Sequence, residues 1–185
     1  MTERYDVAVI GGGSAGLAAL KRLSDLGKQA VLIEAGRQVG TKNVSGGILY
    51  SKKPKQGKAN NVEDLYENFE KEAPVERKIT KYVLHATSKD RDFAIDLTKA
   101  HEYQSNFGYS VLLNKLNSWF AKQAVEAAEK HGGGIVSGVH VRSIGWSDGR
   151  AVIETDELEP FEVKAVIAAD GVNSEIAEMT NARSK

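Results

Sequence analysis

A glycine-rich turn near the N-terminus has the residue types and the spacing of a phosphate-binding turn. Gly11, Gly13 and Gly16 form a G-x-G-x-x-G pattern, between an apolar run and a stretch with apolar residues at helical spacing. In such a turn the first glycine permits the tight bend, the second lets a pyrophosphate approach the backbone, and the third lets the helix pack closely on the strand. The free N–H groups at the start of the helix then bind the phosphates, and we expect Ser14 and Ala15 to contribute there.

An acidic residue follows at the spacing that dinucleotide sites require. Glu34 ends the apolar run Ala30–Glu34, about 20 residues after the glycine turn. Its carboxylate would accept hydrogen bonds from the hydroxyls of an adenosine ribose and would repel a 2′-phosphate, which disfavours NADP. The sequence therefore predicts a dinucleotide site that includes Glu34 and its neighbour Ala35. The alternative is a glycine-rich turn that binds nothing, in a chain that holds 18 glycines.

A second turn with candidate binding residues follows the last apolar run of the chain. Ala169, Asp170 and Gly171 come at the end of the predicted strand Lys164–Ala169. An Asp-Gly pair by itself indicates only a turn. A doubly wound sheet, however, would place this strand beside the first one, at the edge where such sheets bind ligands. We therefore expect these three residues to line the same site as the glycine turn.

The elements that must position these residues form a βαβ unit. Tyr5–Ile10 and Ala30–Glu34 are short apolar runs that predict buried parallel strands, and Ala15–Leu26 has the periodicity of a helix between them. A strand, helix and strand within this length should give a parallel pair with a crossover helix. The predicted fold class is therefore α/β, a Rossmann-like fold with a parallel sheet and a crossover antiparallel β-meander between Val139 and Val163.

The other elements are expected from periodicity and turn residues. A helix is predicted over Val111–Lys130, and a hairpin turn over Ser147–Gly149. The segment Gly36–Lys58 has little periodicity and predicts a long functional loop or extended segment. The remaining expected elements are a short helix over Asn61–Glu72, a hairpin of Lys78–Ala86 with Arg91–Leu97, and strands over Ile135–Val136, Val139–Trp146, Arg150–Thr155 and Phe161–Val163.

Composition excludes several function classes. The 25 basic and 25 acidic residues give no net charge that would attract nucleic acid. The chain has no cysteine, so disulfides, thiolate nucleophiles and Cys-ligated clusters are excluded, and any redox chemistry needs an organic cofactor. The four histidines lack metal-ligand spacing, so no metal site is expected. Without a signal peptide or a membrane-length apolar run, we expect a cytoplasmic location with at most peripheral membrane contact.

These motifs together carry a family resemblance. The glycine turn and the later Ala-Asp-Gly element resemble the FAD-binding domain of glutathione-reductase-type flavoproteins, in the branch of the geranylgeranyl reductases and aromatic hydroxylases. The segment Gly40–Tyr50 (GTKNVSGGILY) is similar to the G-x-K-N-V-x-G-G-x-L-Y stretch of FixC-like dehydrogenases, which are relatives of electron-transfer-flavoprotein:quinone oxidoreductase. Ala73–Arg77 and Tyr109–Leu112 also match, so the resemblance covers essentially the whole chain. Leu113 stands where many of these relatives have arginine.

The resemblance implies FAD as the cofactor and assigns further residues to its binding. It places Lys42, Ser45, Gly46 and Gly47 near the flavin ring, and it places backbone groups near Val139 at the adenine. A lysine beside the ring would stabilise negative charge on the flavin. The other interpretation of Lys42 is a solvated loop cation. No side chain is expected to act as a catalytic group, because the flavin itself does the redox chemistry.

The resemblance also implies a function and a domain plan. We expect an FAD-dependent oxidoreductase that takes electrons from electron-transfer flavoprotein or another reduced donor and passes them to quinone or a ferredoxin. The alternatives are an NAD(P)H-dependent flavoenzyme of the reductase or hydroxylase type, and a non-catalytic nucleotide-binding fragment. Residues 1–185 are expected to be the N-terminal part of an FAD-binding domain, with 36–108 as an inserted loop and hairpin region and no catalytic or quinone domain. Such a chain alone should bind FAD weakly, self-associate and show no steady-state activity.

Overall fold

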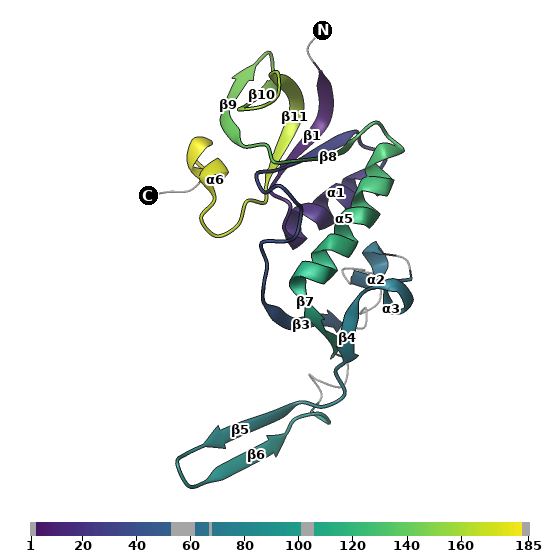
Figure 1. Cartoon of the computed structure of the whole chain (residues 1–185), viewed down its shortest axis with the longest axis vertical. Helices are drawn as coiled ribbons and strands as arrows, with labels where there is room; N and C mark the ends of the chain where they lie inside the picture. Colours follow the sequence, from purple (N-terminus) through teal and green to yellow (C-terminus); the bar gives the residue numbers. More distant parts are fainter. Residues whose placement is uncertain (1–2, 53–61, 67, 101–105, 183–185) are drawn as a thin grey trace. The chain divides into compact units, whose positions relative to one another are not determined.

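The computed structural model describes residues 3–52, 62–66, 68–100 and 106–182 (Figure 1). Its Cα positions divide the chain into two compact units. Unit 1 comprises Met1–Val44 and Asn114–Lys185, and unit 2 comprises Ser45–Leu113. The glycine turn, Glu34 and the Ala-Asp-Gly turn therefore belong to one unit, while Ser45, Gly46 and Gly47 belong to the other.

The core of unit 1 is a six-stranded sheet with the order β8-β2-β1-β11-β10-β9. Four of these strands are parallel and two are antiparallel, which confirms the predicted α/β fold with its meander. The strands are β1 (Arg4–Ile10), β2 (Ala30–Glu34), β8 (Gly134–Ser137), β9 (Val141–Ser147), β10 (Arg150–Thr155) and β11 (Phe161–Ala168). The strands β1 and β11 are neighbours, so the glycine turn and the Ala-Asp-Gly turn leave the sheet side by side.

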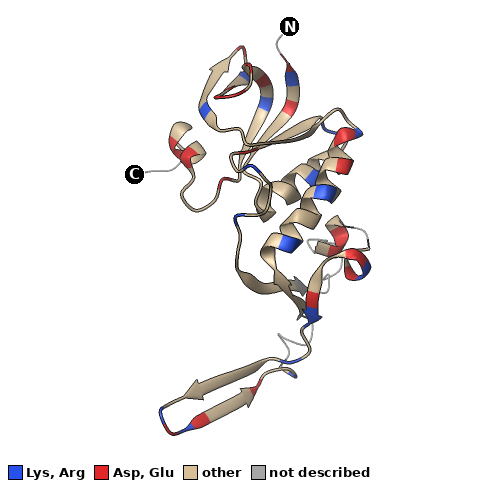
Figure 2. Cartoon of the chain, in the orientation of Figure 1, with Lys and Arg blue, Asp and Glu red and all other residues tan. Residues whose placement is uncertain are grey.

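The strand β2 and the helix α1 (Ser14–Asp25) form the part of the core that supports the glycine turn. Every residue of β2 is buried, as expected for a parallel strand that is covered on both faces. Leu17 and Leu20 of α1 are completely buried. The helix α5 (Leu113–Glu129) buries Leu116 and Phe120, and charged residues of both signs lie on its surface (Figure 2).

The structure corrects two predictions in the C-terminal half of the chain and adds one helix. Phe161–Val163 and Lys164–Ala169 are not separate strands, because one continuous strand, β11, pairs with β10 along its first part and with β1 along its whole length. Val111 and Leu112 belong to a strand and not to the predicted helix, which begins at Leu113. The short helix α6 (Glu175–Met179) was not expected.

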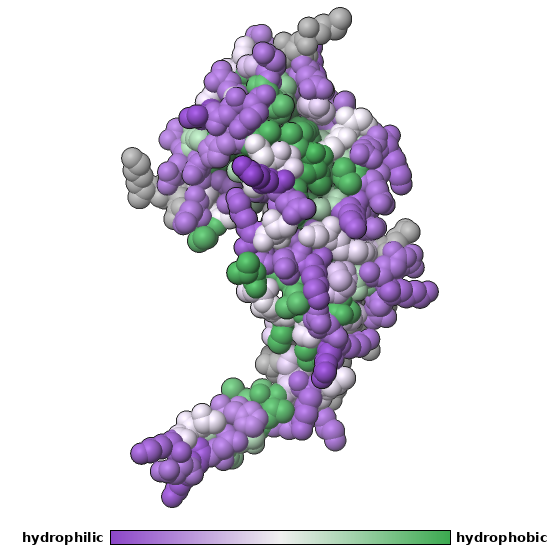
Figure 3. Space-filling view, viewed as in Figure 1, coloured by the Kyte–Doolittle hydropathy of each residue, from purple (hydrophilic) through white to green (hydrophobic). Residues whose placement is uncertain are grey.

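Unit 2 contains a three-stranded sheet with the order β3-β7-β4 and a separate hairpin. Its elements are β3 (Gly46–Lys52), α2 (Val62–Leu65), α3 (Phe69–Glu72), β4 (Val75–Lys78), β5 (Val83–Thr87), β6 (Asp92–Asp96) and β7 (Asn106–Leu112). The segment Gly36–Lys58, predicted as a long loop or extended segment, contains the extended strand β3. Residues 53–58 of that segment lie outside the described part. The predicted hairpin is present as β5 and β6, and its Leu84 and Phe93 side chains are exposed. Figure 3 shows hydrophobic residues on the surface of this hairpin.

Within the described part of the chain, none of the helices has both the length and the apolar character needed to cross a membrane.

Candidate functional site

The three glycines of the N-terminal turn differ in the space around them. Gly11 has a φ of 106°, and a Cβ there would lie 2.4 Å from the Ala169 carbonyl oxygen. A Cβ on Gly16 would lie 1.9 Å from the Gly11 carbonyl oxygen, because α1 packs directly on the turn. Gly13 is the N-cap residue of α1 with a φ of −76°, and a Cβ there would meet nothing within 4 Å. The turn is thus tightly packed at Gly11 and Gly16 and open at Gly13.

Glu34 ties this turn to the segment that follows β2. Its Oε2 accepts a hydrogen bond from the Gly12 N–H at 2.7 Å, and its Oε1 accepts one from the Gly36 N–H at 2.6 Å. The Lys42 Nζ lies 3.3 Å from Oε1. Glu34 is only 9% exposed, and burial of a carboxylate costs free energy unless it has hydrogen-bond or ionic partners. Two backbone donors and one cation provide these partners and hold the carboxylate at the ends of β1 and β2.

Lys42 lies at the carboxylate that is predicted to bind the ribose. Its side chain is largely exposed, so the ion pair with Glu34 is screened by water. Ser45 lies just before β3 in unit 2, where Gly46 and Gly47 pair with Leu112 and Val111 of β7. The predicted position of these four residues near a flavin ring stays a prediction.

The Ala-Asp-Gly turn organises the start of α6. Asp170 accepts hydrogen bonds from the Ser174 hydroxyl at 2.6 Å and from the Ile176 N–H at 3.1 Å. Ser174 in turn caps the helix by accepting from the Ala177 N–H. Both carboxylate oxygens of Asp170 therefore accept hydrogen bonds from the start of α6. The sequence analysis did not predict this structural role. Gly171 has a φ of 94°, which favours glycine at this position.

A direct backbone contact joins the two turns. The Ala169 N–H donates to the Ile10 carbonyl at 2.8 Å, and the Gly11 N–H donates to the Ile33 carbonyl at 2.8 Å. These bonds continue the pairing of β11 with β1 and of β1 with β2 just beyond the strand ends. The turns that follow β1 and β11 are thereby held at the same edge of the sheet.

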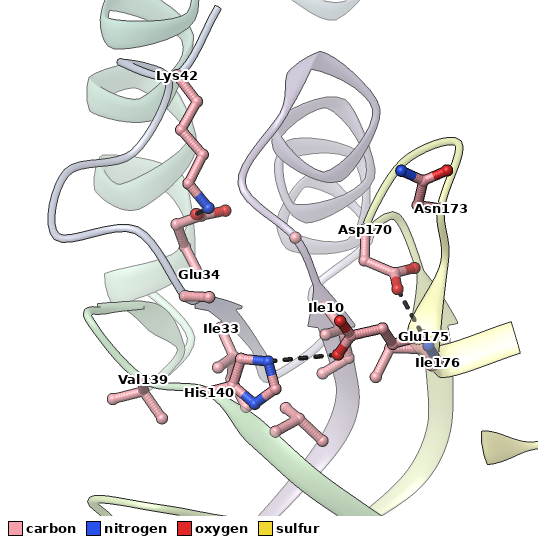
Figure 4. Close-up of a pocket in the computed structure, with 13 residues that line it drawn as sticks. Ile10, Ile33, Glu34, Lys42, Val139, His140, Asp170, Asn173, Glu175 and Ile176 are labelled. Atoms are coloured by element: carbon pink, nitrogen blue, oxygen red, sulfur yellow. Dashed lines mark hydrogen bonds and ion pairs between the residues drawn. The ribbon is translucent and has the colours of Figure 1, made fainter. Parts of the chain in front are cut away.

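A pocket of about 340 Å³ opens at this edge (Figure 4). The ends of β1 and β2, the start of β9 and the helix α6 form its walls. The predicted site residues that line it are Gly11, Glu34, Ala35, Lys42, Val139 and Asp170. Gly13, Ser14, Ala15 and Gly16 lie at the neighbouring start of α1, and Ala169 and Gly171 flank Asp170. The structure therefore gathers these twelve of the fifteen predicted residues in unit 1.

The backbone N–H groups around Val139 already have partners within the protein. The Gly138 N–H donates to the Gly36 carbonyl at 2.9 Å, and the Val139 N–H donates to the Glu34 carbonyl at 3.1 Å. The His140 N–H donates to the Glu157 carboxylate at 3.3 Å. These bonds fix the wall of the pocket to β2 and leave none of the three N–H groups free to bind a base.

The pocket also contains residues that the sequence analysis missed. His140 precedes β9 and Glu175 begins α6, and their side chains meet at the pocket with Nε2 and Oε2 3.4 Å apart (Figure 4). The sequence carried only an indirect signal for Glu175, namely Ser174 as a helix N-cap directly before it. No signal marked His140.

Asn117 is a further residue that the sequence analysis missed. It is completely buried, and its Oδ1 accepts a hydrogen bond from the Ser14 hydroxyl at 2.7 Å. This bond joins the start of α1 to α5. The signal in the sequence was a polar residue beside Leu116 on the apolar stripe of the helix.

This arrangement fits the ADP half of an extended dinucleotide. Gly13 has open space on its Cβ side, at a helix start where a phosphate can approach the backbone N–H groups. Glu34 supplies a carboxylate in a fixed position, and aliphatic side chains form part of the wall of the pocket beside it. Among the described residues no group of histidine, aspartate and glutamate side chains could hold a metal ion.

Comparison with known proteins gives related sequences and folds. Residues 6–184 match the family model for FAD dependent oxidoreductases (DAO). The chain is 35% identical over 175 residues to Protein FixC of Salmonella typhi. This match covers 94% of the chain and 38% of Protein FixC. It is 30% identical to the probable electron transfer flavoprotein-quinone oxidoreductase YdiS of Escherichia coli (strain K12), over 93% of this chain and 38% of that protein. The chain thus spans less than half of the length of these curated relatives.

Among solved structures, a geranylgeranyl bacteriochlorophyll reductase-like protein from Thermoplasma acidophilum aligns with a TM-score of 0.69. The alignment covers 96% of this chain and 42% of that chain, at 22% sequence identity. At this identity the likeness shows the fold alone, and it agrees with the α/β architecture of unit 1.

Proposed function

Because the chain belongs to the FAD dependent oxidoreductase family, we propose that unit 1 binds the ADP half of FAD in the pocket described above. The observation that carries this proposal is the Glu34 carboxylate, which Gly12 and Gly36 hold at the pocket beside the start of α1. A carboxylate fixed at this position can accept hydrogen bonds from both ribose hydroxyls. The open side of Gly13 then leaves room for the pyrophosphate.

The residues of the chain bind and orient the cofactor, and the flavin supplies the redox chemistry when bound. In this proposal Ser14, Ala15 and the start of α1 face the pyrophosphate, and Lys42 balances the charge of Glu34. Ser45, Gly46 and Gly47 face the flavin ring, where small residues leave room for a planar group. No side chain of the described residues is assigned a proton transfer.

For the whole protein we propose electron transfer from electron-transfer flavoprotein, or another reduced donor, to quinone or a ferredoxin. The names of the relatives support this proposal, because one of them is a probable electron transfer flavoprotein-quinone oxidoreductase. We propose a cytoplasmic location, with at most peripheral contact to a membrane.

The proposed donor is tested by anaerobic mixing of the FAD-loaded chain with reduced electron-transfer flavoprotein, NADH or NADPH. Because electron-transfer flavoprotein is itself a flavoprotein whose absorbance returns as it is oxidised, the chain is separated from each donor before its remaining oxidised flavin is measured. We expect the flavin of the chain to bleach fastest with reduced electron-transfer flavoprotein. Faster bleaching with NADPH or NADH would contradict the proposed donor and favour an NAD(P)H-dependent flavoenzyme.

Removal of the Glu34 carboxylate is expected to weaken ADP binding roughly ten- to a hundredfold. A hydrogen bond to a charged group contributes about 1.5–3 kcal/mol, and about 1.4 kcal/mol corresponds to a factor of ten in affinity. Isothermal titration of Glu34→Ala with ADP measures the loss. FMN has no adenosine, so its affinity should hardly change.

Two further variants separate binding from folding in this experiment. Glu34→Gln loses the charge and keeps one acceptor oxygen, which can serve the N–H group of Gly12 or of Gly36 but not both. It should bind ADP more tightly than Glu34→Ala and more weakly than the unaltered chain, and circular dichroism reports whether each variant is folded. Glu129→Ala removes an exposed carboxylate at the end of α5 and should bind ADP as the unaltered chain does. Equal losses for ADP and FMN in Glu34→Ala would show that Glu34 has a structural role only.

A further inference from the structure

Aliphatic side chains form one part of the pocket wall, which we call the apolar slot. Ile10, Ile33, Val139, Val141 and Ile176 line it, and each of them is at most 6% exposed. They come from the ends of β1 and β2, from the start of β9 and from α6, so aliphatic side chains enclose the space from several directions. Because this slot lies beside the carboxylate that is proposed to bind the ribose, the base of the nucleotide is the part that would enter it.

Most polar groups at this slot are already engaged. The Glu34 carboxylate has two backbone donors and Lys42, and both oxygens of Asp170 bind the start of α6. The N–H groups of residues 138–140 have partners elsewhere in the protein. Three other side chains that line the pocket can bind a polar group on the edge of a base, namely those of His140, Asn173 and Glu175.

Glu175 lies at that rim with acceptor capacity to spare. Its Oε2 lies 3.4 Å from the His140 Nε2, a contact that Figure 4 marks with a dashed line. A carboxylate has two oxygens with about four acceptor positions and no donor, so one contact with His140 leaves both oxygens able to accept. The contact also holds the carboxylate over the apolar slot. The side chain is more than half exposed, so a ligand can reach it.

From this geometry, and resting on the proposed function, we propose that Glu175 selects adenine. Its carboxylate accepts a hydrogen bond from the 6-amino group of the base, while the aliphatic walls contact the ring faces. Because the carboxylate is acceptor-only, a purine without the 6-amino group loses this bond and gains none in its place. Glu175 is thus a specificity-determining residue for the nucleotide, and the His140 side chain positions it.

The test compares ADP with purine riboside 5′-diphosphate, which has hydrogen in place of the 6-amino group. Isothermal titration gives both affinities for the unaltered chain, for Glu175→Met and for Glu178→Met. Methionine keeps the length of the side chain and its helix propensity but cannot accept a comparable hydrogen bond. Glu178 is the matched control, because it is an exposed glutamate of the same helix that does not line the pocket.

The unaltered chain should bind ADP about fivefold or more tightly than purine riboside 5′-diphosphate. The hydrogen bond from the 6-amino group to Glu175 is charge-assisted but partly exposed to water, which limits the difference. Glu175→Met should reduce this preference to less than about twofold through weaker ADP binding, and Glu178→Met should keep it. A preference that persists in Glu175→Met, or that is absent from the unaltered chain, would overturn the inference. Failure of the unaltered chain to bind either nucleotide would overturn the proposed cofactor site as well, so the two failures are distinguishable.

Discussion

A valine in place of Gly13 is expected to abolish FAD binding and to leave the protein folded. Gly13 has a φ that other residues adopt, and a Cβ at this position would meet nothing within 4 Å. The fold therefore has room for a side chain here. That room is the space in which the pyrophosphate would approach the N–H groups of α1, so a branched side chain excludes the phosphates. Fluorescence titration with FAD, together with circular dichroism of the variant, measures both effects.

The matched control for this variant is Gly145→Val. Gly145 lies in β9, and a Cβ there also meets nothing within 4 Å, but the residue does not line the pocket. This variant should bind FAD as the unaltered chain does. A folded Gly13→Val protein with unchanged FAD affinity would show that the dinucleotide does not bind at this turn.

An alanine in place of Gly16 is expected to destabilise unit 1 by about 3 kcal/mol or more, which is the upper range for overpacked sites. A Cβ at this position would lie 1.9 Å from the Gly11 carbonyl oxygen, a backbone atom that cannot rotate away. The start of α1 would have to move off the turn, and Gly11 is itself held by its hydrogen bond to the Ile33 carbonyl. Urea unfolding followed by circular dichroism measures the change in the free energy of unfolding.

Gly134→Ala is the control for backbone substitution in the same unit. Gly134 begins β8, and a Cβ there meets nothing within 4 Å. Its free energy of unfolding should stay within about 1 kcal/mol of that of the unaltered chain. If Gly16→Ala proved as stable as Gly134→Ala, the close packing of α1 on the glycine turn would be wrong.

The elements around the glycine turn could be predicted because their signals are local. The apolar run Ala30–Glu34 matches β2 exactly in its bounds, and the expected helix after the turn begins one residue earlier in the structure, at Ser14. Period and spacing within a few residues determine such elements. The pairing of β1 with β2 and with β11 then follows from the parallel order of the sheet, and it brings the two turns together.

Other features depend on pairing between distant segments, which leaves no local signal. Val111 and Leu112 continue the apolar stripe of the helix that follows, yet both pair as strand residues with Gly47 and Gly46. The contact of His140 with Glu175 joins residues that lie 35 positions apart in the sequence, and only the fold brings them to one pocket. In such places tertiary contacts override the local pattern.

Several residues that line the pocket were among those predicted from the sequence, but the hydrogen bonds between them were not. The Glu34 carboxylate was expected to bind the ribose hydroxyls. In the structure it also accepts hydrogen bonds from the N–H groups of Gly12 and Gly36. Asp170 was expected to line the site, and it does, but both of its oxygens also order the start of α6. A carboxylate in a turn satisfies nearby backbone donors as well as a ligand, and sequence spacing does not show which donors these are.

The central claim is that unit 1 holds the cofactor through its ADP half, and competition between ligands tests it most directly. FAD is titrated with the chain until its fluorescence is quenched, and ADP or FMN is then added in excess. The account predicts that ADP restores the fluorescence of free FAD and that FMN has little effect, because the pocket, Glu34 and the start of α1 are proposed to contact adenosine and pyrophosphate. Displacement of FAD by FMN but not by ADP would contradict the account.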